Sequence, residues 1–307
     1  MIDNISSRIL VMCNLTNDCN QKCTHCISNA RAGERIELNL ETVERFISYM
    51  QQKKYDFMVS FVGGEATIWP DFYKLLESKI FKSVQYKMLY TNATALNDSK
   101  IRKIKDANFY EVRVSIDSDR KEEHDDLRGI GMFDKTLLYT KKMIEIGIPV
   151  TAATVLKQNN KDRIDEIITY VKSIGVKLLH IIPLYMTGRG ASAKDYVVNQ
   201  KEIEKIRLDL KHKYADACEI RTPLCIEGTS YIKIECDGCC YIQKGRDKRF
   251  IGNINDRDFK KICYNLESNI HNLSVISCQM CPYYTDPILC ENMYPYCLTD
   301  ISLNKID

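Results

Sequence analysis

Short apolar runs alternate with helically spaced segments over residues 8 to 185, and this alternation limits most strongly what the chain can fold into. Six of the runs have the length and composition of buried parallel strands. They are Ile9 to Cys13, Phe57 to Val62, Tyr86 to Tyr90, Val112 to Ile116, Val150 to Leu156 and Leu178 to Leu184. Strand–helix units joined in succession by right-handed crossovers build either an open doubly wound sheet or part of a β/α barrel. Periodicity alone leaves both of these α/β folds open.

The pattern changes after a further predicted helix, Glu202 to Tyr214. Beyond it the segments shorten, and one clear element is a hairpin from Tyr231 to Ile242 with its turn at Asp237-Gly238. We therefore predict a first domain of residues 1–215 and a small second domain of residues 216–307. Because the second segment has few periodic apolar runs, we expect bound metal to supply much of its order.

Composition excludes several classes of protein. Hydrophobic residues make up 45% of the chain, enough to bury a core. Lys and Arg number 44 against 41 Asp and Glu, and the two signs are interleaved, so no basic stripe indicates nucleic acid. No stretch approaches ~18 consecutive apolar residues, and the amino-terminal apolar run is short, so neither a membrane span nor a signal peptide is predicted. We expect a cytoplasmic protein.

The 14 cysteines are distributed very unevenly. Four lie between residues 13 and 26, none between 27 and 217, and ten between 218 and 297. In a reducing compartment, dense cysteines indicate metal or redox chemistry more often than structural disulfides. The thiols could serve zinc, iron–sulfur clusters or both.

Cys19, Cys23 and Cys26 form a CxxxCxxC run just after the first predicted strand. Three thiolates in one short loop can hold three irons of a cubane cluster and leave the fourth iron open for another ligand. A zinc knuckle or a set of buried thiols is the alternative. Zinc sites usually use two separated cysteine pairs, so the spacing favours an iron–sulfur cluster.

Polar or glycine-rich groups follow the next three predicted strands. They are Gly63-Gly64-Glu65, Thr91-Asn92 and Ser115-Ile116-Asp117. Each group taken singly is common in turns. In β/α folds, however, the carboxyl ends of parallel strands assemble the active site, so these groups and the cysteine run are expected to converge on one pocket.

The cysteine run, followed by Gly63-Gly64-Glu65 in the phrase FVGGEATIWPDF, resembles the radical S-adenosylmethionine (SAM) superfamily. The resemblance covers roughly residues 8 to 190, including the SIDS and HDDLRG phrases between Ser115 and Gly129 and the later phrase PLYMTGRG. It implies a partial barrel of six β/α units. It also implies that the three cysteines hold a [4Fe-4S] cluster whose open iron takes the amino and carboxylate groups of SAM. The residue before the last cysteine, often aromatic in the family, is His25.

The same resemblance implies a set of SAM contacts. Gly63, Gly64 and Glu65 should bind the methionine amino group, Ser115 with Arg128 should face the ribose or the carboxylate, and Asn92 belongs to the same site. The chemistry agrees, because a glutamate accepts from an ammonium group, glycines allow close backbone approach and an arginine can fork onto a carboxylate. The cofactor would supply a 5′-deoxyadenosyl radical, while the protein orients the reactants and excludes water.

The second group of cysteines resembles the SPASM or twitch extension, which carries auxiliary iron–sulfur clusters in peptide-modifying enzymes. Where many family members have a cysteine five residues after the hairpin glycine, this chain has Gln243, and no cysteine follows Cys297. The resemblance implies one or two auxiliary [4Fe-4S] clusters, with a four-thiolate zinc site as the alternative. The expected auxiliary ligands are Cys218, Cys225, Cys240, Cys278, Cys281, Cys290 and Cys297.

Spare thiols remain. Cys236 and Cys239 are candidates for a hydrogen-atom donor or relay, although an inert buried cysteine is the simpler interpretation of either. Cys13, inside the first predicted strand, is expected in the core.

We therefore hypothesise a radical SAM peptide maturase that cross-links or epimerises a ribosomally made peptide. About a dozen residues precede Cys13, so we expect the barrel mouth, the cysteine-rich segment or a separate protein to recognise the peptide. An electron donor such as flavodoxin or ferredoxin would be needed, and no nucleic acid or membrane partner is expected. The alternatives are a radical SAM dehydrogenase or epimerase of a small metabolite, and a non-catalytic zinc-binding module.

Overall fold

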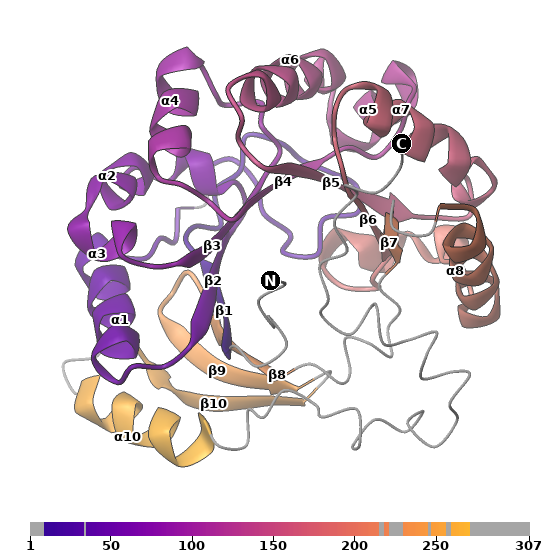
Figure 1. Cartoon of the computed structure of the whole chain (residues 1–307). Coiled ribbons are helices and arrows are strands. Elements are labelled where there is room, and N and C mark those ends of the chain that lie inside the picture. The colour runs from indigo at the N-terminus through magenta and orange to yellow at the C-terminus, as the bar shows by residue number, and fades with distance from the viewer. Residues whose placement is uncertain are drawn as a thin grey trace.

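The computed structural model describes residues 9–33, 35–214, 218–220, 230–244, 247–255 and 259–270. Six parallel strands form its centre: β1 (Ile9–Asn14), β2 (Phe57–Val62), β3 (Tyr86–Thr91), β4 (Glu111–Ser115), β5 (Val150–Leu156) and β6 (Leu179–Pro183). They stand side by side in chain order within one curved sheet (Figure 1). A doubly wound sheet reverses its strand order at an inner strand, so this unbroken order identifies a partial β/α barrel. The prediction of that fold, and of these six strands, is confirmed.

Helices cover the outer face of the sheet, and one more lies beside the later strands (Figure 1). The described helices are α1 (Leu40–Gln52), α2 (Phe72–Glu77), α3 (Lys79–Lys82), α4 (Asp98–Asp106), α5 (Lys121–Arg128), α6 (Met132–Glu145), α7 (Ile164–Ser173), α8 (Gln200–Tyr214) and α10 (Phe259–Ile270). Asn39 and Asn97 cap α1 and α4 by accepting backbone N–H groups, as N-cap residues do. Among the helices of the described ranges, none has the length and apolar character to cross a bilayer.

The core lies between the sheet and these helices. Alternate strand residues such as Val11, Val59 and Leu89 are at most 2% exposed and pack against helix side chains that include Phe46 and Phe81. The alternation follows from the pleat of a strand, which sends successive side chains to opposite faces. The opposite, inner face of the sheet is therefore free to carry polar groups at the strand ends.

The later strands extend the same sheet at both edges. They are β7 (Cys218–Ile220), β8 (Ser230–Ile234), β9 (Cys239–Lys244) and β10 (Asp247–Asn253). The predicted hairpin is β8–β9, and β8 runs parallel to β1 with Val11 opposite Ile232. β7 pairs with β6 at the other edge. Strands on both sides of the proposed boundary near residue 216 thus share one sheet, and the boundary itself stays a prediction.

Pairing of β8 with β1 makes the hairpin part of the main core. We predict that Ile232→Ala, at a side chain with 0% exposure, lowers the free energy of unfolding by about 2–5 kcal/mol. Ile130→Ala, at a side chain that is 93% exposed, should change it by less than about 0.5 kcal/mol. Urea denaturation followed by circular dichroism measures both. Equal small effects would show that the hairpin does not pack as described.

Candidate functional site

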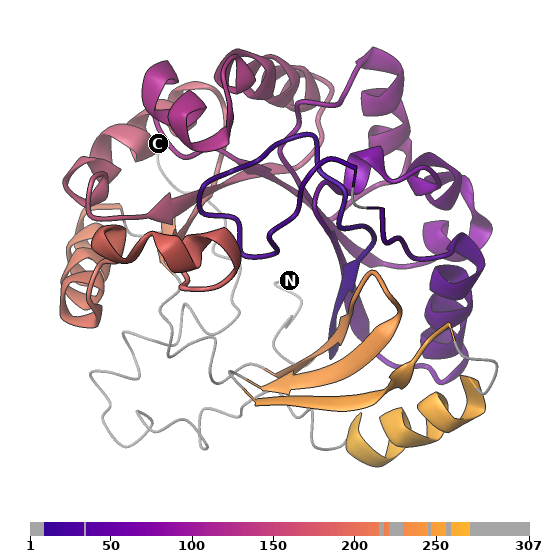
Figure 2. The same cartoon turned by 180° about the vertical axis from the view of Figure 1, so that it is seen from behind.

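Residues 15–33, between β1 and α1, form the cysteine loop, which carries Cys19, Cys23 and Cys26. Cys19 and Cys23 are buried, and Cys26 is partly exposed. Figure 2 shows the loop, in indigo, extending from β1 across the curve of the sheet. Thr24 N donates to Leu127 O of α5 at 3.0 Å, so the loop is also fixed to the segment that follows β4. The loop therefore lies over the carboxyl ends of several strands.

Hydrogen-bond donors approach two of the three sulfurs. Gln21 N lies 3.4 Å from Cys19 Sγ, and Asn92 Nδ2 lies 4.0 Å from the same sulfur. Arg128 Nη1 lies 3.8 Å from Cys23 Sγ. Burial raises the pKa of Cys19 to about 12 and also raises that of Cys23, while the Gln21 N–H and the Arg128 guanidinium act in the opposite direction on the two thiols. Ionisation of these thiols therefore calls for a bound cation, as metal coordination provides.

This donor set fits an iron–sulfur cluster. Iron–sulfur clusters are bound by cysteine thiolates and are tuned by N–H donors and by shielding from water. Cys19 and Cys23 are buried, and each sulfur has an N–H donor near it. Within the described ranges, no group of three or more Cys, His, Asp or Glu side chains is arranged to hold a single metal ion.

The glycine turn after β2 packs directly on the backbone of the cysteine loop. Gly64 N donates to Thr16 O at 2.7 Å, and Glu65 N donates to Asp18 O at 2.9 Å. A Cβ on Gly64 would lie 2.1 Å from Asp18 O, and one on Gly63 would lie 2.7 Å from Thr16 O. Both positions therefore require glycine. The sequence indicated a close backbone approach at this turn, and the approaching group in the structure is the protein's own cysteine loop.

Glu65 ties the end of β2 to the end of β3. Its carboxylate is 2% exposed and accepts from Thr91 Oγ1 at 2.6 Å, Asn92 N at 2.7 Å, and both Thr67 N and Thr67 Oγ1 at 3.1 and 2.6 Å. Three of these donors reach Oε1, and one, Asn92 N, reaches Oε2. The predicted contact between Glu65 and an amino group of SAM stays a prediction.

Asn92 continues this chain of contacts into the cysteine loop. Its Nδ2 donates to Asn20 Oδ1 at 2.9 Å, and its Oδ1 accepts from Thr94 N at 2.9 Å. Ser115, at the end of β4, is partly exposed and pairs with Ala153 of β5. The two residues thus lie at neighbouring strand ends, as the sequence indicated.

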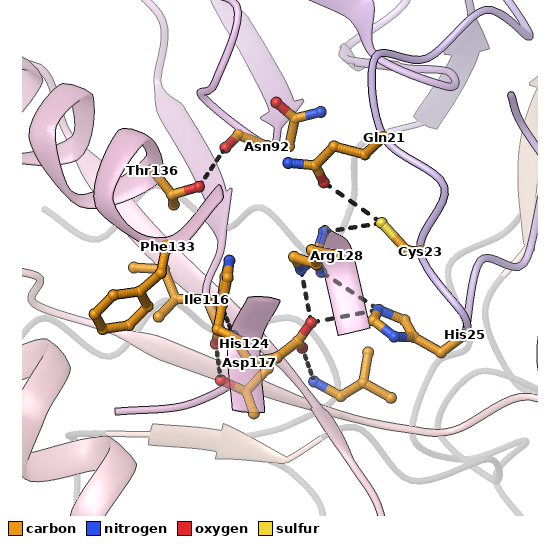
Figure 3. Close-up of polar contacts among 12 residues, drawn as sticks. Gln21, Cys23, His25, Asn92, Ile116, Asp117, His124, Arg128, Phe133 and Thr136 are labelled. Atoms are coloured by element: carbon orange, nitrogen blue, oxygen red, sulfur yellow. Dashed lines mark hydrogen bonds and ion pairs between the residues drawn. The ribbon is translucent and has the colours of Figure 1, made fainter. Parts of the chain in front are cut away.

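A buried charge network lies under Cys23 (Figure 3). Arg128 Nε donates to Asp117 Oδ2 at 2.7 Å, and Arg128 Nη2 lies 3.4 Å from His25 Nε2. His25 Nε2 is in turn 3.4 Å from Asp117 Oδ2. Burial alone would raise the pKa of Asp117, but Arg128 and His25 hold it well below its usual range. Arg128 is therefore committed on one side to Asp117, and its Nη atoms face the cysteine loop.

Asp117 also organises the strands and the helix around it. Its Oδ1 accepts from Val155 N at 2.9 Å, and its own N–H donates to His124 Nδ1 at 3.3 Å. The acceptor role of Nδ1 leaves the proton of neutral His124 on Nε2. Burial lowers the pKa of His124 to about 4, and the nearby Arg128 acts in the same direction.

Arg189, in the loop after β6, is a site residue that the sequence did not single out. Its Nε donates to Cys23 O at 2.7 Å. It belongs to the phrase PLYMTGRG, but nothing in that phrase predicts a contact with a segment 166 residues earlier.

The second cysteine group is only partly within the described ranges. Cys240 has 0% exposure, lies beside Cys13 in the core, and has a pKa raised by burial. Cys236 and Cys239 are partly exposed next to the hairpin turn. Their predicted roles, as ligand or hydrogen donor, stay predictions. Cys218 lies in β7, and the other five expected ligands, Cys225, Cys278, Cys281, Cys290 and Cys297, lie outside the described residues.

Comparison with known proteins identifies the family. The family model described as the radical SAM superfamily matches residues 13–171. Mycofactocin maturase MftC of Mycolicibacterium smegmatis is 28% identical over 182 residues, which cover 59% of this chain and 46% of that protein. The chain thus matches about half the length of this relative.

Solved structures share the fold. Native anSMEcpe with bound AdoMet and Kp18Cys peptide superposes with a TM-score of 0.66 at 20% identity, covering 90% of this chain and 87% of that one. Streptococcus suis SuiB bound to precursor peptide SuiA gives a TM-score of 0.62 at 13% identity, covering 76% and 59%.

The contact between Gly64 and the cysteine loop predicts a specific loss. Gly64→Ala should move Asp18 and reduce cluster binding about 10- to 100-fold, as changes behind metal ligands do. Gly33→Asn is the matched control, because Gly33 lies in the same loop with φ +88° and open space where a Cβ would stand. Iron content after anaerobic reconstitution, with circular dichroism to confirm folding, measures the effect. Full iron content in Gly64→Ala would contradict it.

The buried histidine predicts acid sensitivity. The folded pKa of His124, about 4, lies below the unfolded value of about 6.5, so the unfolded state takes up its proton first as the pH falls. Stability should therefore decrease between pH 6.5 and 4 by up to roughly 3 kcal/mol from this group. His124→Asn should flatten this slope, and the exposed His212→Gln should not. Urea midpoints across this pH range test it, and an unchanged slope in His124→Asn would contradict it.

Proposed function

We propose that this chain, which belongs to the radical SAM superfamily, is an enzyme that modifies a ribosomally made peptide by cross-linking or epimerisation. The observation that carries the proposal is the cysteine loop itself. The start of the loop is bonded to the glycine turn after β2, and Cys23 lies beside Arg128, which is paired with Asp117. A site of this kind suits a cluster that must keep one iron open.

The peptide substrate is supported by the structural neighbours. The anSMEcpe structure with AdoMet and a peptide shares its fold with nearly the whole of this chain, and SuiB is seen with a precursor peptide. The partial barrel leaves its sheet unclosed between β7 and β10 within the described ranges. An unclosed sheet is compatible with an extended substrate such as a peptide.

Each residue of the site has a proposed task. Cys19, Cys23 and Cys26 would hold the [4Fe-4S] cluster, and the backbone of Gly63 and Gly64, with Glu65, Asn92, Ser115 and Arg128, would orient SAM. When bound, the cluster and SAM supply a 5′-deoxyadenosyl radical for hydrogen abstraction. The chain positions its donors around the sulfurs and keeps water from Cys19 and Cys23 by burying them.

Further cofactors and partners complete the proposal. One or two auxiliary [4Fe-4S] clusters would use cysteines between residues 218 and 297, and an external donor such as flavodoxin or ferredoxin would supply electrons. Cys236 and Cys239 remain candidates for hydrogen-atom transfer.

Cluster loading and SAM cleavage test the enzyme class. After anaerobic reconstitution we expect about 8 to 12 irons per chain if one or two auxiliary clusters are present, and about 4 if only the cysteine loop is loaded. Reduction with SAM should release 5′-deoxyadenosine. Cys23→Ala should abolish the release, whereas Cys263→Ala, in α10, should not. No 5′-deoxyadenosine from a fully loaded protein would refute the radical mechanism.

A peptide assay separates the proposed substrate from a small metabolite. Reduced enzyme with SAM should change short precursor peptides encoded beside its own gene. Mass spectrometry in D₂O distinguishes the outcomes, because a cross-link removes hydrogen and epimerisation takes up solvent deuterium. Cys236→Ala and Cys239→Ala should at most alter the product. Turnover of a small metabolite, with every such peptide left unchanged, would favour the alternative.

A further inference from the structure

The loop after β6 is hydrogen-bonded to the cysteine loop at residues that the glycine turn does not contact. It includes the 3-10 helix η4 (Gly188–Ser192), which contains Arg189. Arg189 Nε donates to Cys23 O at 2.7 Å, Nη1 donates to Ala30 O at 2.8 Å, and the backbone N–H donates to Cys26 O at 2.9 Å. All three acceptors are main-chain carbonyls of the cysteine loop.

These hydrogen bonds fix the segment of residues 23–30 at three points. The guanidinium holds both ends of residues 23–30, and the Arg189 backbone holds Cys26 between them. The planar fork of an arginine can serve two fixed acceptors at once, which the point charge of a lysine cannot do in the same geometry. Arg189 is half-buried, so its donors are partly shielded from competing water.

The glycines on either side of Arg189 make this approach possible. A Cβ on Gly188 would lie 2.3 Å from Cys26 O, and its φ of +56° is in the left-handed region that favours glycine. A Cβ on Gly190 would lie 2.4 Å from Tyr185 O. A side chain at Gly188 would therefore push the two loops apart.

We propose that Arg189 is a positioning residue for the cluster, setting the orientation of Cys23 and Cys26 through their carbonyl groups. The glycine turn after β2 fixes the start of the cysteine loop, and Arg189 fixes its end. β2 and β6 are separated by three strands in the sheet. The two contacts therefore fix the loop at two strand ends that lie far apart. The role goes beyond the proposed peptide chemistry and does not depend on which substrate is used.

The test compares Arg189→Lys with Arg45→Lys. Arg45 is a matched control, because its guanidinium also donates to a backbone carbonyl far along the chain, Ile254 O, and stacks on Phe259 away from the cysteine loop. Hydrogen exchange of the metal-free proteins, read by mass spectrometry over residues 16–31, reports loop order without any cofactor. Electron paramagnetic resonance of the reduced cluster, with and without SAM, reports how the cysteines hold it.

Arg189→Lys should raise exchange over residues 23–30, alter the spectrum with SAM, and slow substrate-free 5′-deoxyadenosine release about 10- to 100-fold. Arg45→Lys should change none of these. Wild-type exchange in the loop, or a wild-type spectrum despite faster exchange, would overturn the proposal.

Arg189→Gln is the second variant if Arg189→Lys does not fold, with the same expectations. Loss of folding in both would also overturn the proposal, because the residue would then support the whole fold. Failure of the wild-type protein to cleave SAM would refute the proposed function instead, and the exchange experiment would still decide the role of Arg189.

Discussion

The site depends on one close contact, in which the backbone of the cysteine loop lies against the glycine turn after β2. Asp18 O occupies the space that a side chain at Gly64 would need, so the loop can approach only because that side chain is absent. Hydrogen bonds connect this contact to the next strand end. Glu65 accepts from Asn92 N after β3, and Asn92 Nδ2 donates to Asn20 in the loop. The cysteines are thus held by main-chain geometry as much as by their own side chains.

A buried ion pair also stabilises the site. Asp117 and Arg128 are buried together beneath Cys23, and removing either partner would leave the other charge uncompensated in a poorly solvated place. Arg128 Nη1 lies beside the sulfur of Cys23, while Asp117 also accepts from Val155 N. A bound anionic cluster or a carboxylate would meet donors already in position, without the cost of reorganising them.

Local patterns in the sequence predicted the six strands, the hairpin and the three cysteines, because strand period, turn residues and ligand spacing all act over a few residues. Contacts between distant segments could not be predicted in this way. Three examples are the pairing of β8 with β1, the hydrogen bond from Arg189 to Cys23 O and the hydrogen bond from Thr91 to Glu65. Each joins parts of the chain that are close only in the folded protein. The glycines were identified from sequence as a point of close approach, and the structure places Thr16 O and Asp18 O of the cysteine loop there. Their predicted contact with SAM stays a prediction. Arg128 was likewise predicted to face a ligand, and its pairing with Asp117, in the segment after β4, could not be read from the sequence.

The proposed function requires SAM to bind directly to the cluster of the cysteine loop. Electron–nuclear double resonance of the reduced, reconstituted protein tests it, using SAM labelled with ¹⁵N at the methionine amino group. We expect a ¹⁵N hyperfine coupling large enough to require an iron–nitrogen bond. Absence of that coupling in fully loaded protein saturated with SAM would contradict it.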